Sequence, residues 1–335
     1  MRRIMIAGLM LAASHGTAFA WGAAGHRMIG ELAAKNFPVQ IPAFLRTPQA
    51  RFQIGQLARE PDISKGAGQP HDADLDPGHY VNVSDDGTIR GGPKLSDLPA
   101  TRRDYDTALR AAGTNQYAVG YLPYNLMGGY QQLVKDFAIL RMTMAAQKYA
   151  RQFSMTSEER RRFAREHALR EMLTLRDLGW WAHFVGDTAN PMHATIHLNG
   201  WRGDSNPRGF TTARGTHAKF EEVFVNANIA DADVAARLRP YRACACTIAQ
   251  RTQDYLAASW ALVVPTYELE KSGALDTATP ESSAFVAERL AEGASQLRDW
   301  VTDAWDDSAK ATLGYRNPMS VADLESGKAD PHLLN

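Results

Sequence analysis

Apolar residues recur with a helical period along most of this chain of 335 residues, and this pattern restricts the fold more than any other feature. Strand-like alternation is confined to short runs such as residues 80–83. The sequence therefore predicts an all-α fold, a compact multi-helix domain. The expected helices cover residues 23–36, 96–112, 123–153, 157–186, 216–226, 231–239, 244–262 and 282–306.

Two long stretches rich in Gly, Pro, Asp and Asn interrupt this helical pattern, at residues 60–93 and 191–215. Loops of that length inside a compact domain are usually functional or disordered. Both stretches contain histidines, which favours function. Because no repeat, low-complexity tract or Pro/Ser-rich linker marks a boundary, we expect a single domain over residues 21–335.

The first twenty residues have the pattern of a secretory signal peptide. Two arginines, Arg2 and Arg3, precede an apolar run over residues 4–13, and Ala18-Phe19-Ala20 forms a small-x-small cleavage signal. This predicts removal of residues 1–20, a mature chain that begins at Trp21, and a secreted or periplasmic protein. No later stretch approaches about 20 uninterrupted apolar residues, so we expect the mature protein to be soluble, and nothing in the sequence indicates more than a monomer.

Charge and cysteine content exclude some classes of protein. The chain has 37 basic and 37 acidic residues, and a balanced charge does not fit a polycation that captures nucleic acid at long range. The two cysteines are Cys244 and Cys246. They could pair in an oxidising compartment, but a ring with one intervening residue is strained within a predicted helix, so we expect no structural role for them.

The strongest local signal is His183-Phe184-Val185-Gly186-Asp187 at the end of a predicted helix, followed by Asn190-Pro191-Met192-His193. His183 and Asp187 are four positions apart, so their side chains share one helix face and can bind one metal ion together. His193 follows the turn that Pro191 enforces, and it can return toward the same region.

His217 and Glu221 repeat the four-residue spacing on another predicted helix. One such pair alone is more often a solvated ion pair or a buried histidine with a partner than a metal site. Two pairs with His193 between them, together with Trp21 and His26 at the predicted mature start, favour a metal centre.

These residues resemble the zinc-binding motifs of the superfamily that joins zinc-dependent phospholipases C to single-strand nucleases of the S1/P1 type. The resemblance rests on Trp21-Gly22 with His26, on residues 183–193, and on His217 with Glu221, in that order over most of the chain. It implies that the N-terminal tryptophan donates its free amine and its carbonyl oxygen to zinc. Cleavage of the signal peptide would then complete the site.

The resemblance also implies two ligands in the first loop, Asp62 in Glu60-Pro61-Asp62 and His79 in Gly78-His79-Tyr80. The neighbouring His71, Asp72, Asp74 and Asp76 leave an alternative register open. The implied set is three zinc ions, the first held by Asp62, His79, His183 and Asp187, the second by Trp21, His26 and Asp187, and the third by His193, His217 and Glu221. A metal-bound hydroxide would attack the phosphate, and Asp62 would orient or deprotonate the water as the catalytic residue.

The sequence contains features of enzymes with two different substrates, phospholipids and nucleic acids. Glu221 in place of aspartate is phospholipase-like, which predicts cleavage of glycerophospholipids to diacylglycerol and a phosphorylated head group during transient contact with a membrane surface. The short spacing from Trp21 to His26 is nuclease-like, and Tyr80 and Asn82 stand where nucleases bind a base. The alternative is therefore a single-strand-preferring nuclease or 3'-nucleotidase that binds nucleic acid.

Two further features bear on this choice. The choline pocket of the best-known bacterial phospholipases is not carried over, because its glutamate corresponds to Ala24 and its two aromatics to Ile63 and Asp76. Head-group preference is therefore open, although an aromatic from elsewhere could serve. A third interpretation, a zinc-binding structural or adhesive protein, is disfavoured because structural zinc sites are usually closed four-ligand cages.

Overall fold

The computed structural model describes residues 21–203, 205–316 and 318–334. The structure is 63% helical, and its one sheet within the described residues pairs β1 (Thr312–Leu313) with β2 (Met319–Ser320) in antiparallel register. The predicted all-α class is confirmed. The predicted signal peptide, residues 1–20, lies outside the described residues, and the single domain stays a prediction.

Short turns separate most of the helical elements, but residues 80–101, and 194–203 with 205–215, are long irregular segments. The first predicted irregular stretch, residues 60–93, is therefore irregular mainly from residue 80, because short helical turns form before it. In chain order the helical elements are α1 (Gly22–Lys35), η1 (Ala43–Arg46), α2 (Pro48–Leu57), α3 (Glu60–Lys65), α4 (Asp72–Leu75), η2 (Asp76–His79), α5 (Arg102–Ala111), α6 (Gln116–Val119), α7 (Leu122–Lys148), α8 (Ser157–Ala189), η3 (Pro191–His193), α9 (Thr216–Ala218), η4 (Lys219–Val223), α10 (Phe224–Asn228), α11 (Asp231–Ala235), α12 (Ile248–Trp260), α13 (Val263–Lys271), α14 (Pro280–Ser308), α15 (Val321–Glu325) and η5 (Pro331–Leu334).

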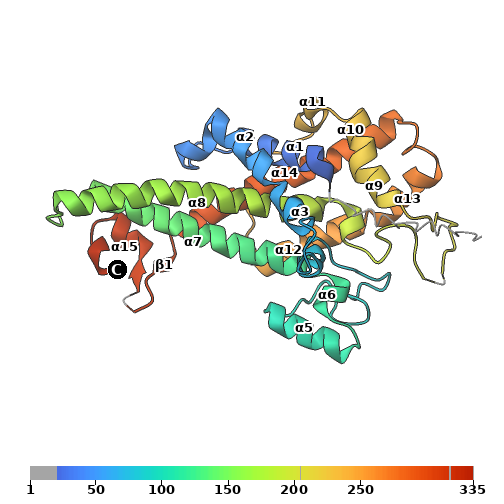
Figure 1. Ribbon diagram of the computed structural model, residues 1–335, viewed down its shortest axis with the longest axis horizontal. Coiled ribbons are helices and arrows are strands. Elements are labelled where there is room, and N and C mark those ends of the chain that lie inside the picture. Colours follow the sequence, from blue (N-terminus) through green and yellow to red (C-terminus); the bar gives the residue numbers. More distant parts are fainter. Residues whose placement is uncertain (1–20, 204, 317, 335) are drawn as a thin grey trace, which may run out of the picture.

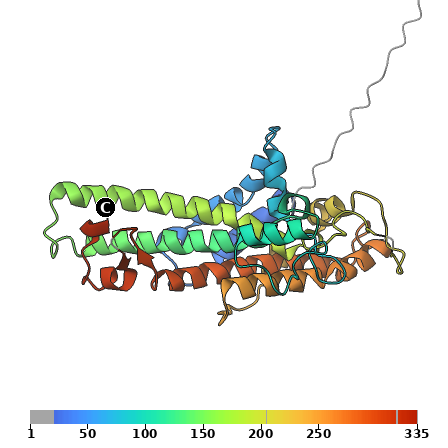
Figure 2. The same cartoon turned by 90° about the horizontal axis from the view of Figure 1, so that it is seen from below.

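Three long helices, α7, α8 and α14, run side by side along the long axis of the molecule (Figures 1 and 2). Their contacts are aromatic at the centre: the ring centroids of Trp181 and Trp300 lie 5.6 Å apart, and those of Tyr130 and Trp300 lie 6.3 Å apart. Helices α1 and α2 pack against α8. Many of the shorter elements, among them α3, α9 and α10, lie toward the end of the molecule where α8 finishes, whereas α15 and β1 lie at the opposite end (Figure 1). The metal-ligating residues predicted above lie at the end where α8 finishes.

Helix α8 carries the strongest predicted motif into the core. Its start is fixed by a capping box, in which the Thr156 hydroxyl accepts from the Glu159 backbone N–H and the Glu159 carboxylate accepts from the Thr156 backbone N–H. The helix has 33 residues, or about 50 Å of length. Its first half is largely exposed, but residues 181–189 are all buried, and Pro191 stops it just beyond Ala189. His183 and Asp187 are therefore held on a rigid, fully buried last turn.

Two predicted helices begin later than the sequence pattern indicated. The helix predicted from residue 96 begins at Arg102, because Pro99 interrupts the stretch and the Thr101 side chain caps the Asp104 backbone N–H. The helix predicted from residue 244 begins at Ile248, capped by Thr247. Residues 244–246 are consequently non-helical, which removes the geometric objection to a bridge between the two cysteines.

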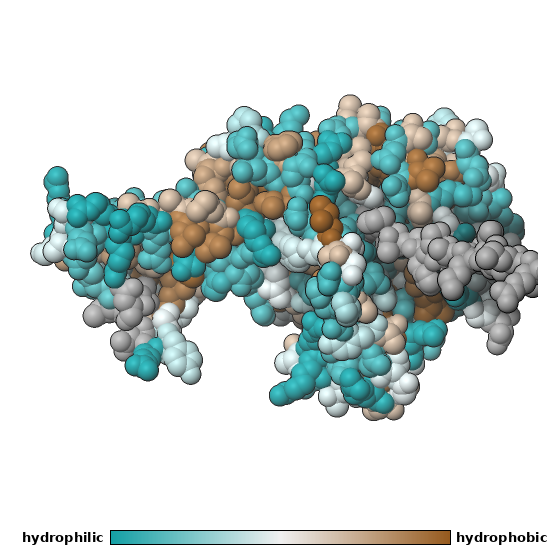
Figure 3. Space-filling model, viewed as in Figure 1, coloured by the Kyte–Doolittle hydropathy of each residue, from teal (hydrophilic) through white to brown (hydrophobic). Residues whose placement is uncertain are grey.

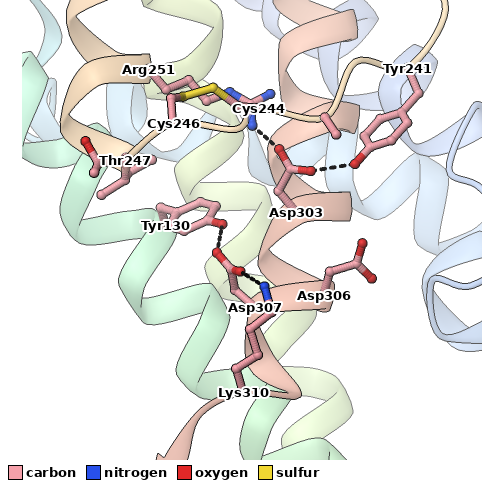
Figure 4. A pocket seen from close by; sticks show the side chains of 12 residues that line it. Tyr130, Tyr241, Cys244, Cys246, Thr247, Arg251, Asp303, Asp306, Asp307 and Lys310 are labelled. Carbon is pink, nitrogen blue, oxygen red and sulfur yellow. Dashed lines mark hydrogen bonds and ion pairs between the residues drawn. A yellow bond between two sulfur atoms is a disulfide. The ribbon is translucent and has the colours of Figure 1, made fainter.

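Cys244 and Cys246 form a disulfide in the structure, at the edge of a cavity of about 360 Å³ (Figure 4). We expected no structural role for these cysteines because we placed them in a helix. The disulfide corrects that expectation. Beside the disulfide, Asp303 of α14 accepts hydrogen bonds from Tyr241 and Arg251. These contacts tie the non-helical segment before α12 to the long helix α14.

The described residues include no helix that is both long and apolar enough to cross a membrane. Some large apolar side chains are nevertheless exposed, and on the face in Figure 3 apolar residues gather along the middle of α8 and beside α2. The exposed apolar side chains of these two helices are Phe52, Leu169, Met172 and Leu173.

Candidate metal centre

The predicted metal-ligating side chains come from five separate parts of the chain and meet in the core. Three groups of side chains, each with ligand atoms within 4.8 Å of one another, could each hold a metal ion. The groups are His26, His183 and Asp187; Asp62, His79 and His183; and His193, His217 and Glu221. The structure thus brings together all eight side chains that the sequence nominated as metal ligands.

Asp187 joins the first two groups through its two carboxylate oxygens. Oδ2 lies 3.2 Å from Nε2 of His183 and 3.3 Å from Nδ1 of His79. Oδ1 lies 3.4 Å from Nε2 of His26 on the other side. Because its two oxygens face different histidines, Asp187 has the arrangement of a carboxylate that bridges two cations.

Asp62 closes the outer side of the group around His79 and His183. Its Oδ1 lies 3.8 Å from Nδ1 of His79 and 3.7 Å from Nε2 of His183. The same oxygen lies 3.0 Å from the ammonium of Lys65, which is buried one helical turn later on α3. Lys65 was not identified from the sequence; the signal that pointed to it was its i+3 spacing from Asp62 on a short helix.

The third group depends on an irregular helix. His217 lies on α9 and Glu221 on η4, a single π turn, and Nε2 of His217 lies 2.8 Å from Oε2 of Glu221. Nε2 of His193 is 3.0 Å from Nε2 of His217 and 3.5 Å from the same carboxylate oxygen. π turns of this kind are frequent at functional sites.

Trp21 reaches this third group from the start of α1. Its backbone N–H donates to Oε2 of Glu221 at 3.0 Å, and its indole N–H donates to the Gly186 carbonyl at 2.8 Å. Its own carbonyl accepts from the Gly25 backbone N–H at 3.1 Å. The residue is completely buried. The resemblance assigned this nitrogen to the second ion, with His26 and Asp187, but its hydrogen-bond partner in the structure is Glu221 of the third group.

Backbone carbonyls orient two of the imidazoles. Nδ1 of His183 donates to the Ala58 carbonyl at 2.8 Å, and Nδ1 of His193 donates to the His79 carbonyl at 2.6 Å. Because Nδ1 donates to a carbonyl, Nε2 of each ring is the nitrogen that faces the centre and could bind a metal ion. Such hydrogen bonds are a regular feature of metal-ligating histidines.

Several buried polar atoms of the centre have no hydrogen-bond partner among the described residues. They are both ring nitrogens of His26, both carboxylate oxygens of Asp187, Nδ1 of His217 and Oε1 of Glu221. A buried polar atom without a partner costs about 1–3 kcal/mol. A bound cation would satisfy the carboxylate oxygens and one nitrogen of His26, so the donor set fits metal ions.

The electrostatics of the centre keep the Asp187 carboxylate ionised and shift the pKa values of the histidines in both directions. Burial opposes ionisation of Asp187, but His183 and His193 outweigh it and hold the pKa of Asp187 well below its usual range. Burial and the ammonium of Lys65 lower the pKa of His79 to about 4. In contrast, Asp187 and Glu221 outweigh burial at His193 and raise its pKa to about 9. A metal ion at the third group therefore has to displace a proton from His193.

The candidate substrate residues lie next to the centre. Tyr80 follows His79 directly and is half-buried, and burial together with Asp76 raises its pKa to about 12. Asn82 is half-buried, and its side-chain Oδ1 is buried and has no hydrogen-bond partner in the described part of the chain. The structure shows neither residue in contact with a ligand.

Asn190 has a role that the sequence analysis did not assign. Its side-chain N–H donates to Oε2 of Glu221 at 3.0 Å, and its side-chain oxygen caps η3 by accepting from the Met192 backbone N–H. It thus ties the turn that carries His193 to the carboxylate of the third group. The motif containing Asn190 was visible in the sequence, but its partner across the fold was not.

Comparison with known proteins does not assign this chain to a family. Neither the protein-family models nor the curated proteins include one that matches this sequence. The family resemblance seen in the motifs therefore stays a prediction, and the geometry carries the argument below.

Proposed function

We propose that this protein is a trinuclear zinc phosphodiesterase of the phospholipase C type, which cleaves glycerophospholipids to diacylglycerol and a phosphorylated head group. The observation that carries the proposal is Asp187, whose two oxygens face separate groups of histidines in a buried centre. Two cations shared by one carboxylate are typical of enzymes that displace a group at phosphorus. Export to the periplasm or beyond is part of the same proposal.

The donor set supports zinc and an open site. Imidazole nitrogens with one or two carboxylates are ligands that zinc prefers, and catalytic zinc sites keep three protein ligands and one open position. The first two groups share His183, so eight side chains serve three ions. Eight side chains are fewer than three closed four-ligand cages would need, which favours an enzyme over a zinc-binding structural protein.

When bound, the zinc ions would supply positive charge against the phosphate oxygens and make water more acidic. The protein itself contributes a general base, Asp62, and a residue that holds this base in place, Lys65. Burial raises the pKa of Asp62, but His183 and Lys65 outweigh this and lower it, so the carboxylate is ionised at neutral pH. Asp62 would accept a proton from the attacking water, and Lys65, 3.0 Å away, holds that carboxylate in place. No serine or cysteine nucleophile is needed.

The decisive experiment compares two substrates. The chain that begins at Trp21 is given phosphatidylcholine vesicles and single-stranded DNA in parallel, each with and without EDTA. Release of phosphocholine that EDTA abolishes, with the DNA intact, supports the phospholipase proposal. EDTA-sensitive cleavage of DNA with intact vesicles contradicts it.

A single-strand-preferring nuclease or 3'-nucleotidase is the second candidate, and Asn82 is the observation that favours it. Its buried, unpartnered Oδ1 could accept a hydrogen bond from a nucleobase, with Tyr80 as the stacking ring. If DNA is the substrate, Asn82→Ala should lower its cleavage while leaving the metal content unchanged.

A further inference from the structure

We propose that a pocket beside the metal centre, bounded by Trp201, Trp260 and Asp85, binds the quaternary ammonium group of the substrate. This inference rests on the proposed diesterase function and assigns its head-group specificity. The cavity has a volume of about 400 Å³. The lining residues that the argument uses are Asp85, Thr195, Trp201, Arg208, Trp260 and Val263.

The pocket is attached to the segments that carry the metal ligands. The Val81 backbone N–H donates to the His193 carbonyl at 2.8 Å, and the Ile196 backbone N–H donates to the Val83 carbonyl at 3.0 Å. These two hydrogen bonds align the strand-like segment after His79 with the segment after His193. Asp85 and Thr195 of the pocket therefore lie only a few residues from metal-ligating side chains.

Helix α12 attaches the opposite wall to the centre. The Ser259 hydroxyl donates to the Thr188 carbonyl, one residue beyond Asp187 at the end of α8. Trp260 is the next residue after Ser259, so its half-buried indole is placed from the same turn of α8 that carries the bridging carboxylate.

Trp201 is held rigidly by its neighbours. Its indole stacks on the His197 imidazole with ring centroids 3.6 Å apart and planes inclined by 10°. The indole N–H donates to the Ser205 carbonyl at 2.9 Å, and the Tyr267 ring packs against the indole edge-on at 5.2 Å. A preorganised aromatic wall loses little entropy when a ligand binds against it.

His197, which the metal centre does not use, connects this wall to Asp85. Its Nδ1 accepts from the Arg202 backbone N–H at 3.0 Å, so the proton of the ring is on Nε2, which donates to Oδ1 of Asp85 at 2.9 Å. The imidazole is thus a neutral donor here. It fixes the position of the carboxylate without cancelling its charge.

The charges that face the pocket favour a cation. Arg208 is the basic residue of the lining, and its guanidinium is paired with Glu268 at 2.9 Å. Asp85 keeps a net negative charge, and its side chain is 66% exposed. Two indoles with one carboxylate attract an organic cation, because tryptophan gives the strongest cation–π attraction and a quaternary ammonium needs no hydrogen-bond acceptor. A nucleobase could stack on the indoles, but it carries no positive charge that Asp85 would attract.

Two p-nitrophenyl phosphodiesters of nearly equal shape test this inference. One carries choline, and the other carries 3,3-dimethylbutanol, its uncharged carbon isostere. We expect kcat/KM for the choline ester to exceed that for the isostere by about tenfold. Asp85→Asn keeps an acceptor for His197 but removes the charge, so it should reduce this ratio to about two or below.

Matched variants separate binding from damage to the fold. Asp86→Asn, at the neighbouring exposed carboxylate, should leave the ratio at about ten. Trp260→Leu should reduce the ratio, and Trp260→Phe should restore part of it. Equal kcat/KM for the two esters in the unmodified protein overturns the proposal. So does a preference for thymidine 5'-(p-nitrophenyl phosphate) that Trp260→Leu removes, because the pocket would then bind a base.

If none of these esters is cleaved, the proposed function fails, and the pocket is tested by calorimetry with tetramethylammonium chloride. Binding that Asp85→Asn weakens at least fivefold, with Asp86→Asn unaffected, supports a cation site independent of hydrolysis. Absence of binding to the unmodified protein overturns it.

Discussion

The backbone nitrogen of Trp21 lies 3.0 Å from Oε2 of Glu221, although 200 positions separate the two residues in the chain. Both are completely buried. The contact joins the start of α1 to the π turn η4, so the first described residue is part of the candidate metal centre.

Glu221→Gln should remove one metal ion of the three. The amide keeps the size of the side chain but loses the anionic oxygen that faces His193 and His217. Metal analysis by mass spectrometry should give about two zinc ions per chain. Glu222→Gln, on the adjacent residue outside the three groups, should keep three, and an unchanged zinc content in Glu221→Gln would remove Glu221 from the ligands.

One extra residue ahead of Trp21 should abolish diester hydrolysis. A chain that begins at Trp21 presents a free amine beside Glu221, whereas an added methionine turns this amine into an amide that does not bind zinc. We expect a loss of at least about 100-fold in kcat/KM, as is common when a metal ligand or its support is lost. Equal activity of the two chains would exclude the amine as a ligand.

Asp187→Asn should lose two metal ions together. One carboxylate faces both His26 and His183, so removing its charge weakens two sites. Zinc analysis should give about one ion per chain. A matched control is Glu166→Gln, on the far half of α8, which should retain all three. A finding of three ions in Asp187→Asn would refute the bridge.

Removing the metal should destabilise the fold, because the centre joins α1, α3, η2, α8, η3, α9 and η4 and leaves buried polar atoms without partners among the described residues. One ion at a concentration 100 times its Kd contributes ~2.7 kcal/mol. Excess EDTA should therefore lower Tm by roughly 5 °C or more in a thermal unfolding scan. An identical Tm with and without EDTA would contradict this prediction.

Asp136 should make stability depend on pH. It is buried on α7 beside Asp177 of α8, with Gln132 donating to both carboxylates. Burial and Asp177 raise its pKa to about 6. Because its folded pKa lies above the unfolded value, the unfolded chain ionises first. The stability that protonated Asp136 contributes is fully present below its unfolded pKa of 3.8, and it is lost as the pH rises through about 6.

Asp136→Asn should consequently raise the free energy of unfolding by about 1–2 kcal/mol at pH 7 and by little at pH 4. Urea unfolding of the metal-free protein at the two pH values measures this difference. The exposed Asp97→Asn serves as a control, and the same gain at both pH values would show that Asp136 is not the titrating group.

The sequence predicted the fold class and the ligand side chains because both leave a local signal. His183 with Asp187, and His217 with Glu221, need only a helix to share a face, and the structure gives them that helix apart from one π turn. Among the residues that the sequence did not reveal, Asn190 acts across the fold, because it contacts Glu221 through tertiary packing that no spacing encodes. Lys65 lies three positions after Asp62 on α3, but residues 60–93 were predicted as an irregular stretch, so this helical spacing was not recognised.

Several helices were also missed, and two of them have a proline in the first turn. Helix α2 begins at Pro48, capped by Thr47, and α13 contains Pro265 in its first turn. Proline disfavours a helix interior, but it is tolerated in the first turn, where there is no intrahelical N–H to lose. His197 illustrates the remaining limit: its link between Asp85 and Trp201 depends on residues more than 100 positions apart.

The π turn η4 has a consequence for chain length. A π turn fits one more residue into a turn than an α-helix does, so the buried Phe224 and Val225 of α10 are rotated by about 100° relative to His217. Deleting a single residue there would rotate α10 relative to α9. His217 on α9 and the apolar side chains of α10 could then not both keep their present positions. This stretch should therefore accept many substitutions at its exposed positions, such as Val223, yet reject any insertion or deletion.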